Sequence, residues 1–240
     1  MNLNKPLYIL SLLFLLPLRA CQSQTQSDDA VYEYKPGDYS GIGKWYMGRE
    51  ISHVMGYQGM NWLERSDREE EENTSTLLDN MNLQSTDVVA DIGAGSGYHV
   101  FKIAPQVNKG KVYAVDIQQE MLKAMKDKKE DLSQNNVELI KGTEKSTQLP
   151  KNAVDKVLMV DVYHEFEFPV EMIASIKKGL KPKGKIYLIE YRAEDPQVPI
   201  KRLHKMSEAQ AVKEMKAAGF KLIENIDNLP WQHCMVFGME

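Results

Sequence analysis

The chain has 240 residues, of which 42% are hydrophobic, so it is long and apolar enough to form one large domain or two small ones. Its formal net charge is −4, from 30 basic and 34 acidic side chains, and it lacks the basic excess that attracts nucleic acid. We therefore expect a globular protein without a nucleic acid partner.

The first 21 residues are typical of a targeting segment. Lys5 precedes an apolar run over residues 7–18, which is shorter than the roughly 20 residues of a membrane-spanning helix. The small residue Ala20 followed by Cys21 resembles a bacterial lipobox, in which Cys21 becomes the lipidated N-terminus. A plain secretory signal and an uncleaved anchor are the alternatives. The segment predicts a lipoprotein on the periplasmic side of the cell envelope, or else a secreted or periplasmic soluble protein.

Two further segments precede the main domain. Residues 22–40 are polar and are predicted to form a flexible tether. Residues 41–82 are rich in apolar and aromatic side chains and are predicted to form an N-terminal helical cap on the following domain. His53 and Gln58 lie among these aromatic residues, which favours a cap that also closes a site and contacts a substrate.

Residues 83–240 are predicted to form one domain in which strands and helices alternate. Apolar, β-rich runs predict seven strands, at 87–92, 111–116, 137–141, 155–160, 185–191, 220–226 and 233–238. This alternation is typical of a doubly wound α/β sheet, mostly parallel, with helices on both faces.

Helical spacing of apolar residues predicts the helices between these strands. One helix follows Asp116 and is expected to bury Met121, Leu122, Met125 and Leu132. Another runs over about 169–180, is expected to bury Val170, Ile173 and Ile176, and stops before a turn at 181–184. A third begins at a capping box formed by Ser207 and Gln210 and ends at Gly219.

A glycine loop follows the first of the seven strands, with the pattern Asp91-x-Gly93-x-Gly95-x-Gly97. Glycine permits a positive φ and lets a ligand approach the backbone, so this loop is a predicted binding site. Its spacing is not the Gly-x-Gly-x-x-Gly of a dinucleotide site, which argues against a nicotinamide-dependent oxidoreductase. Asp116 ends the next strand, 19 positions after Gly97, where an acid that binds ribose hydroxyls is expected.

This order of strand, glycine loop, strand and acid resembles the class I S-adenosylmethionine-dependent methyltransferases. Leu149-Pro150 before the fourth strand and the stretch 180–185 before the fifth are also similar to that family, so the resemblance covers about residues 80–240. It implies a Rossmann-like methyltransferase fold, S-adenosylmethionine as the cofactor, and methyl transfer as the reaction.

The resemblance also implies which residues contact the cofactor. The glycines and Asp91 are expected near the methionine moiety, Asp116 at the ribose hydroxyls, and Thr143 or Glu144 by the adenine. The expected cofactor-binding residues are Asp91, Gly93, Ala94, Gly95, Gly97, Asp116, Ile117, Thr143, Glu144, Asp161 and Val162.

His164 is the candidate general base, because it follows the fourth strand and an imidazole titrates near pH 6.5. A structural histidine that caps the next helix is the alternative. Tyr163 is its neighbour and the second catalytic candidate. Four residues here are of metal-ligand type, but their sequence demonstrates no ligand geometry, and we expect no metal; they are Asp161, His164, Glu165 and Glu167.

These features favour a methyltransferase that acts on a small molecule or on an envelope component. The alternative is a methyltransferase-like lipoprotein that binds a ligand without turnover. The complete glycine loop and Asp116 favour a working cofactor site, because a disused site has no physical need for them.

Overall fold

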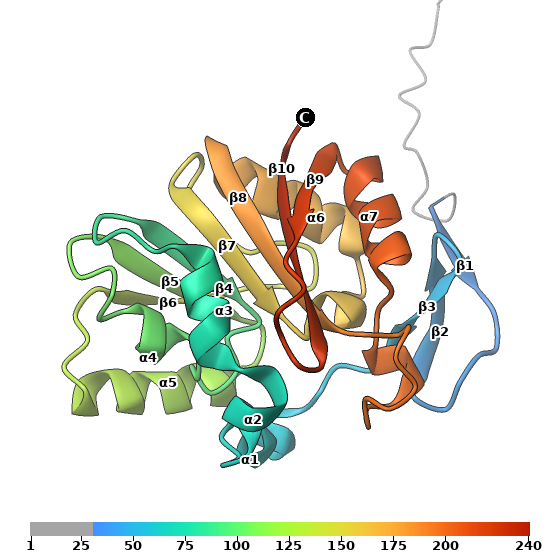
Figure 1. Cartoon of the computed structure of the whole chain (residues 1–240), viewed down its shortest axis with the longest axis horizontal. Helices are drawn as coiled ribbons and strands as arrows, with labels where there is room; N and C mark the ends of the chain where they lie inside the picture. The colour runs from blue at the N-terminus through green and yellow to red at the C-terminus, as the bar shows by residue number, and fades with distance from the viewer. Residues whose placement is uncertain (1–30) are drawn as a thin grey trace, which may run out of the picture.

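The structure, a computed structural model, describes residues 31–240 (Figure 1). The strands are β1 Tyr32–Tyr34, β2 Gly41–Tyr46, β3 Arg49–Ser52, β4 Val88–Ile92, β5 Lys111–Asp116, β6 Val137–Lys141, β7 Val154–Val160, β8 Leu180–Tyr191, β9 Phe220–Asn225 and β10 Gln232–Met239. The α-helices are α1 Met60–Leu63, α2 Arg68–Glu72, α3 Thr74–Met81, α4 Val100–Ile103, α5 Gln119–Asp131, α6 Pro169–Gly179 and α7 Glu208–Ala217. Short 3-10 helices are η2 Tyr57–Gly59, η3 Tyr163–Glu165 and η4 Arg202–His204.

A seven-stranded sheet forms the centre of the molecule, in the order β6-β5-β4-β7-β8-β10-β9. Strands β4 to β8 pair in parallel, whereas β10 is antiparallel to both of its neighbours, β8 and β9. The chain enters the sheet at β4, moves outward to β6 and returns to β7 on the other side of β4. Ligands bind at such a reversal, beyond the carboxyl ends of the strands. The doubly wound, mostly parallel fold is therefore confirmed.

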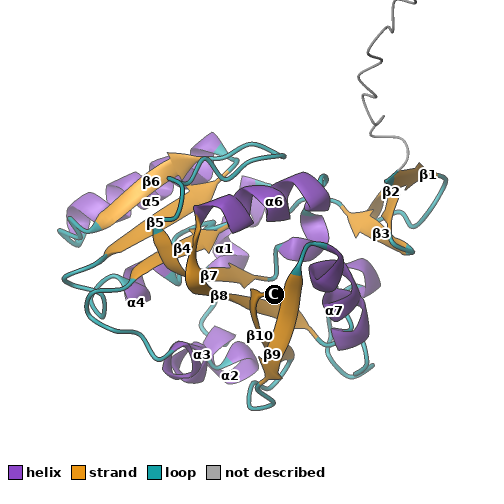
Figure 2. Ribbon diagram, turned by 90° about the horizontal axis from the view of Figure 1, so that it is seen from above, coloured by secondary structure: helices purple, strands orange, loops and turns teal. Residues whose placement is uncertain are grey.

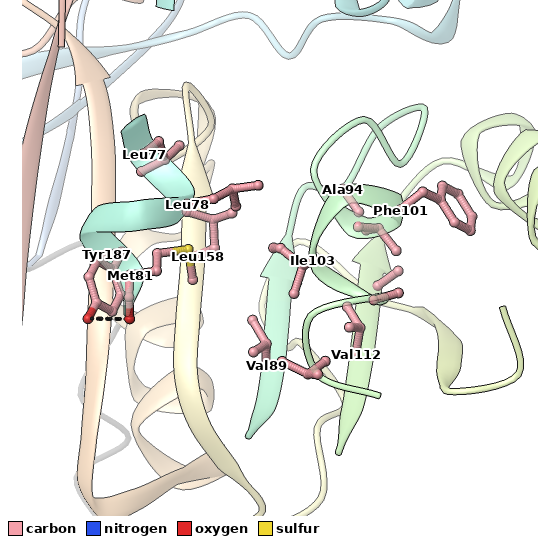
Figure 3. Close-up of a cluster of buried hydrophobic side chains, with 14 of the residues drawn as sticks. Leu77, Leu78, Met81, Val89, Ala94, Phe101, Ile103, Val112, Leu158 and Tyr187 are labelled. Atoms are coloured by element: carbon pink, nitrogen blue, oxygen red, sulfur yellow. Dashed lines mark hydrogen bonds between the residues drawn. The ribbon is translucent and has the colours of Figure 1, made fainter. Parts of the chain in front are cut away.

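Helices cover both faces of this sheet. Alternate strand residues point to opposite faces, so Val89 joins one apolar cluster with α3, α4 and α5, while Ala90 joins another with α6 and α7. Figure 3 shows the first cluster, where Leu77, Leu78 and Met81 of α3 lie against the sheet. Burial on both faces explains why the strands are almost continuously apolar in the sequence.

Most of the predicted elements of the main domain are present. Strands β5 and β6 have the predicted bounds, and the hydroxyl of Ser207 accepts the Gln210 N–H at 3.2 Å, which confirms Ser207 as the N-cap of α7. The reciprocal half of the predicted capping box is not formed, because the side-chain amide of Gln210 donates instead to the carbonyl of Met47 and to Oε1 of Glu214. The turn expected at 181–184 is wrong, because β8 already begins at Leu180. Leu132 and Val170 are also not buried as expected, since they lie at the ends of their helices and are 48% and 38% exposed.

The N-terminal part differs from the predicted tether and helical cap. Strands β1, β2 and β3 form a small antiparallel sheet beside α7, at one end of the molecule (Figure 2). Met47 and Gly48 turn β2 into β3 with φ of 49° and 94°. Two positive φ values are typical of a two-residue hairpin turn whose twist matches its strands. Only the residues after β3 are helical, in the short helices η2 to α3.

Residues 1–30 lie outside the described part of the chain, and with them the predicted targeting segment and Cys21. Within residues 31–240, no helix is long and apolar enough to cross a membrane.

Candidate functional site

A cavity of about 470 Å³ lies at the carboxyl ends of β4, β5, β7 and β8. The glycine loop after β4 and the acid that ends β5 form one wall. The segment from Val54 to Glu72, which contains α1 and α2, contributes the facing side chains Met55, Trp62 and Leu63. The N-terminal segment therefore closes the site, as one interpretation of the sequence predicted, although it is only partly helical.

The glycine loop has the positive φ values that favour glycine. Gly93 has a φ of +73°, and a Cβ there would lie 2.4 Å from a methyl carbon of Val162, which follows β7. Gly95 has a φ of +55°, and a Cβ there would lie 2.6 Å from Cδ1 of Leu63 in α1. The loop is thus pressed between the end of β7 and α1. Gly97 has a different use, because a Cβ there would meet the ring of Phe101 in α4 at 2.6 Å.

Asp116 lies beside this loop at the end of β5. Its side chain is almost fully buried and accepts two backbone hydrogen bonds, from Gly95 N–H at 2.9 Å and Gln118 N–H at 2.8 Å. Burial raises the pKa of Asp116, and these N–H groups oppose the rise. Asp116 therefore links the glycine loop to β5 and holds a carboxylate at the cavity wall.

Two more carboxyl groups lie buried at the neighbouring strand ends. Burial raises the pKa of Asp91 to about 7 against the opposing charge of Arg68, and Oδ2 of Asp91 has no hydrogen-bond partner among residues 31–240. Burial also raises the pKa of Asp161, with support from the carboxylates of Glu72 and Glu190. Asp161 has a φ of +49°, which is rare for a residue with a side chain and is concentrated at functional sites. One oxygen of Asp161 is likewise without a partner.

Most of the expected cofactor residues line the cavity. Those that do are Gly93, Gly95, Asp116, Ile117, Thr143, Glu144, Asp161 and Val162. Those that lie behind its surface instead are Asp91, Ala94 and Gly97.

His164 also lines the cavity and is oriented by a buried acid. Its Nδ1 lies 2.6 Å from Oε2 of Glu190, while Oε1 of Glu190 accepts the N–H groups of Tyr163 at 2.9 Å and His164 at 3.3 Å. Burial alone would lower the pKa of His164, but the carboxylate of Glu190 outweighs it and the pKa is raised. On the other side of the ring, Nε2 lies 3.2 Å from Nδ1 of His204.

Tyr163 is not at the cavity, contrary to its selection as a catalytic candidate. Its ring is 1% exposed and its hydroxyl donates to Oε2 of Glu214 in α7 at 2.8 Å. The same carboxylate accepts two hydrogen bonds from Arg49 of β3. This buried cluster holds the small N-terminal sheet against α7, so Tyr163 has a structural position.

Several residues of the site carry no signal in the sequence that identifies them. Arg68, buried in α2, lines the cavity and is held by Oε2 of Glu72 at 2.7 Å and the carbonyl of Leu63 at 2.7 Å. His204 reaches the cavity from η4, whereas Glu165 in η3, which also lines the cavity, is already evident in the sequence as a residue of metal-ligand type. The positions of Arg68 and His204 depend on long-range folding, whereas the glycine loop is a local pattern.

Comparisons with known proteins agree with this geometry. The family described as a methyltransferase domain matches residues 83–233. An uncharacterized methyltransferase of Bacillus subtilis is 26% identical over 147 residues, which is 61% of this chain and 78% of that protein. The demethylmenaquinone methyltransferase of Oceanobacillus iheyensis is 28% identical over 111 residues, 46% of this chain and 47% of that protein.

A crystal structure with the same fold is also known. It is that of an S-adenosylmethionine-dependent methyltransferase from Aquifex aeolicus, with a TM-score of 0.72 and 25% sequence identity. The match covers 77% of this chain and 98% of that one.

Proposed function

The chain belongs to the methyltransferase domain family, and we propose that it transfers a methyl group from S-adenosylmethionine to a small-molecule acceptor. The observation that carries this proposal is the pairing of Asp116 with the loop glycine Gly95, at the edge of a cavity between the carboxyl ends of four strands. This is the place where a doubly wound sheet binds its ligand.

The residues at the site fit S-adenosylmethionine. Gly93 and Gly95 bring the loop backbone to the cavity wall, and Asp116 beside them would bind the ribose hydroxyls. Asp161 lies at the cavity wall and has one oxygen without a hydrogen-bond partner in residues 31–240, which suits a ligand that carries an ammonium and a sulfonium group, because a buried carboxylate is costly without a donor or cation. Arg68, which also lines the cavity, supplies the positive charge that the carboxylate of the ligand requires.

The reaction needs mainly orientation from the protein. S-adenosylmethionine supplies a methyl group on a sulfonium centre, which departs as a neutral thioether. Holding two reactants in line is worth roughly 7–11 kcal/mol of barrier. Met55, Trp62 and Leu63 supply the apolar wall opposite the strand ends.

His164 is the group placed to take a proton from the acceptor. Because Nδ1 of His164 is bound to Glu190, Nε2 carries the lone pair and is turned toward the cavity side of the ring, where His204 lies. A base in this position contributes about 10² to 10⁴-fold when the acceptor arrives protonated.

The acceptor is proposed to be small and partly apolar. The cavity has apolar side chains on the N-terminal segment and charged side chains on the strand ends, and it accommodates a ligand of limited size. The relative named for demethylmenaquinone matches less than half of this chain, so the acceptor is argued from the cavity and not from that name.

Titration calorimetry with S-adenosylmethionine and its demethylated product tests the cofactor site. We expect Asp116→Ala to weaken both ligands tenfold or more, which is about 1.4 kcal/mol. Asp127→Ala, which removes an exposed acid of α5, serves as the matched control and should bind as the wild type does. A folded wild-type protein that binds neither ligand would contradict the proposal. Release of the demethylated product with candidate acceptors then separates an enzyme from a binding protein.

We also propose that the protein works in the cell envelope, on the basis of residues 1–21. Fractionation of cells that express the full chain tests this. The wild type should pellet with membranes, and Cys21→Ser should release it if lipidation is the anchor. Recovery of the uncleaved wild type from the cytosol would contradict an envelope location.

A further inference from the structure

We propose that His164, Glu165 and His204 form a binding site for one divalent transition-metal ion in the wall of the cavity. Two of the ligands come from η3 and the third from η4, 40 residues further along the chain. The sequence alone predicts no such site, because nothing local connects His204 to the other two residues.

The separations of the three candidate ligand atoms fit one ion. Nε2 of His164 lies 3.2 Å from Nδ1 of His204 and 3.8 Å from Oε1 of Glu165. Nδ1 of His204 lies 3.7 Å from the same oxygen of Glu165. Ligand atoms about 2.0–2.2 Å from a tetrahedral zinc ion stand roughly 3.3–3.6 Å apart. Only small side-chain adjustments are needed to place an ion among these three atoms.

The surroundings orient the ligands as they do in known metal sites. Glu190 is fully buried and contacts Nδ1 of His164 at 2.6 Å, so the proton of the neutral ring is on Nδ1 and the lone pair is on Nε2. A metal-bound histidine commonly donates its other N–H to a carboxylate in this way. Glu165 is held as well, because its Oε1 accepts the backbone N–H of Met55 at 3.1 Å. Both ligands of η3 are therefore fixed before an ion arrives.

The composition of the site selects the kind of ion. Two imidazoles and one carboxylate suit zinc, iron, cobalt or nickel, whereas magnesium and calcium prefer oxygen ligands. Three protein ligands leave at least one coordination position open, which is typical of catalytic and not of structural zinc sites. His164, Glu165 and His204 all line the cavity that the glycine loop also lines, so the open position faces the space for the acceptor.

The consequence for the acceptor rests on the proposed methyl transfer, whereas metal binding itself does not. An ion in this place favours an acceptor with a hydroxyl, thiol or other donor atom, because a bound cation lowers the pKa of such a group. The ion uses the same lone pair on Nε2 that His164 would use as a base. With the ion bound, the ion therefore takes over the role of activating the acceptor, and His164 positions the ion.

Metal titration of chelator-treated protein tests the site. The probes are Zn²⁺, followed by calorimetry, and Co²⁺, followed by its visible absorption. We expect one ion per chain, and at least tenfold weaker binding in His204→Gln and Glu165→Gln. The matched controls are His233→Gln, a buried histidine paired with Glu194 away from the cavity, and Glu167→Gln, which removes a carboxylate two residues from Glu165. Both controls should bind metal as the wild type does.

Two results would overturn the metal site. One is a wild-type protein that binds no ion, and the other is binding that His204→Gln and Glu165→Gln leave unchanged while thermal melts show that both are folded. Parallel titration with S-adenosylmethionine separates the metal site from the proposed methyltransferase function. Failure of metal binding with intact cofactor binding removes only the metal site, and Asp116→Ala should lose cofactor affinity while it keeps its metal affinity.

Discussion

Asp91 is a single residue whose burial lowers the free energy of unfolding. Its carboxyl group is buried at the end of β4, and Oδ2 has no hydrogen-bond partner within the described chain. An unpaired buried acid costs free energy, and the chain responds by holding the proton, with a pKa of about 7. Asp91 therefore lowers the free energy of unfolding at a pH where its carboxyl group would otherwise be ionised.

We predict that Asp91→Asn stabilises the unliganded protein above neutral pH. The carboxyl of Asp91 titrates at about 7 in the folded chain and near 3.9 when unfolded, so the folded state holds an extra proton between these values. The wild type therefore loses free energy of unfolding as pH rises from about 4 to 7, by about 1.4 kcal/mol per pH unit at most, and the Asp91→Asn variant would not show this loss. Urea unfolding at pH 5 and pH 8 measures the difference.

Asp131→Asn, which changes an exposed acid at the end of α5, is the control for this measurement. Equal pH dependence of unfolding in the wild type and in Asp91→Asn would refute the assigned burial cost.

The sequence predicted those site residues that depend on local geometry. Gly93 and Gly95 have positive φ and stand within two positions of each other, and Asp116 ends an apolar run, so each has a pattern that a reader of the sequence can detect. His204 and Arg68 have no such pattern, because they reach the cavity through the packing of η4 and α2. Tyr163 was misplaced for the complementary reason, since adjacency to His164 does not determine which way a side chain points.

At the scale of elements, the contact between β3 and α7 is the feature that the sequence could not indicate. Arg49 and Glu214 are 165 residues apart and form a bidentate pair, with Nε to Oε1 at 2.7 Å and Nη2 to Oε2 at 3.1 Å. Arg49 also donates to the carbonyl of His164 at 3.1 Å. The small N-terminal sheet is thereby connected to the 3-10 helix that carries His164.

We predict that Arg49→Met destabilises the protein by about 3–5 kcal/mol, because it leaves Glu214 buried without its cation. The double variant Arg49→Met with Glu214→Leu should recover most of this loss, since it removes both charges. Chemical denaturation measures all three proteins. Lys123→Met is the control, because it breaks an exposed pair with Asp127 and should cost less than about 1 kcal/mol. Equal losses in Arg49→Met and Lys123→Met would contradict the buried pair.

The central strands of the main domain were predictable because burial on both faces makes β4, β5 and β7 largely apolar runs. The N-terminal hairpin was not predicted, because its signal is only a two-residue turn at Met47-Gly48 between two strands of six and four residues. Lys44 illustrates the difficulty: it is 2% exposed, although a lysine in a sequence indicates a surface position. Its ammonium lies 3.4 Å from the ring centre of Phe168, a cation–π contact that only the folded chain reveals.

At the scale of the whole molecule, the cavity is made by two parts of the chain that the sequence separates. The strand ends supply the glycine loop and the acids, and the segment from Val54 to Glu72 supplies the opposite wall. Leu63 of α1 covers Gly95, and the side chain of Gln118, which follows β5, donates to the carbonyl of Met55 at 2.9 Å. A ligand in the cavity therefore contacts both parts and stabilises the packing of the N-terminal segment on the strand ends.

We predict that the demethylated cofactor stabilises the protein and orders this wall. At a concentration 100 times its Kd, a ligand that binds only the folded state adds about 2.7 kcal/mol, which corresponds to a rise in Tm of roughly 5–10 °C for a chain of this size. Hydrogen–deuterium exchange should slow both at the glycine loop and in α1 and α2, because the ligand lies between them. Asp116→Ala should show neither change at the same concentration. A rise in Tm with unchanged exchange in α1 and α2 would mean that the ligand binds the strand ends alone, and that the N-terminal segment covers the cavity without contributing to binding.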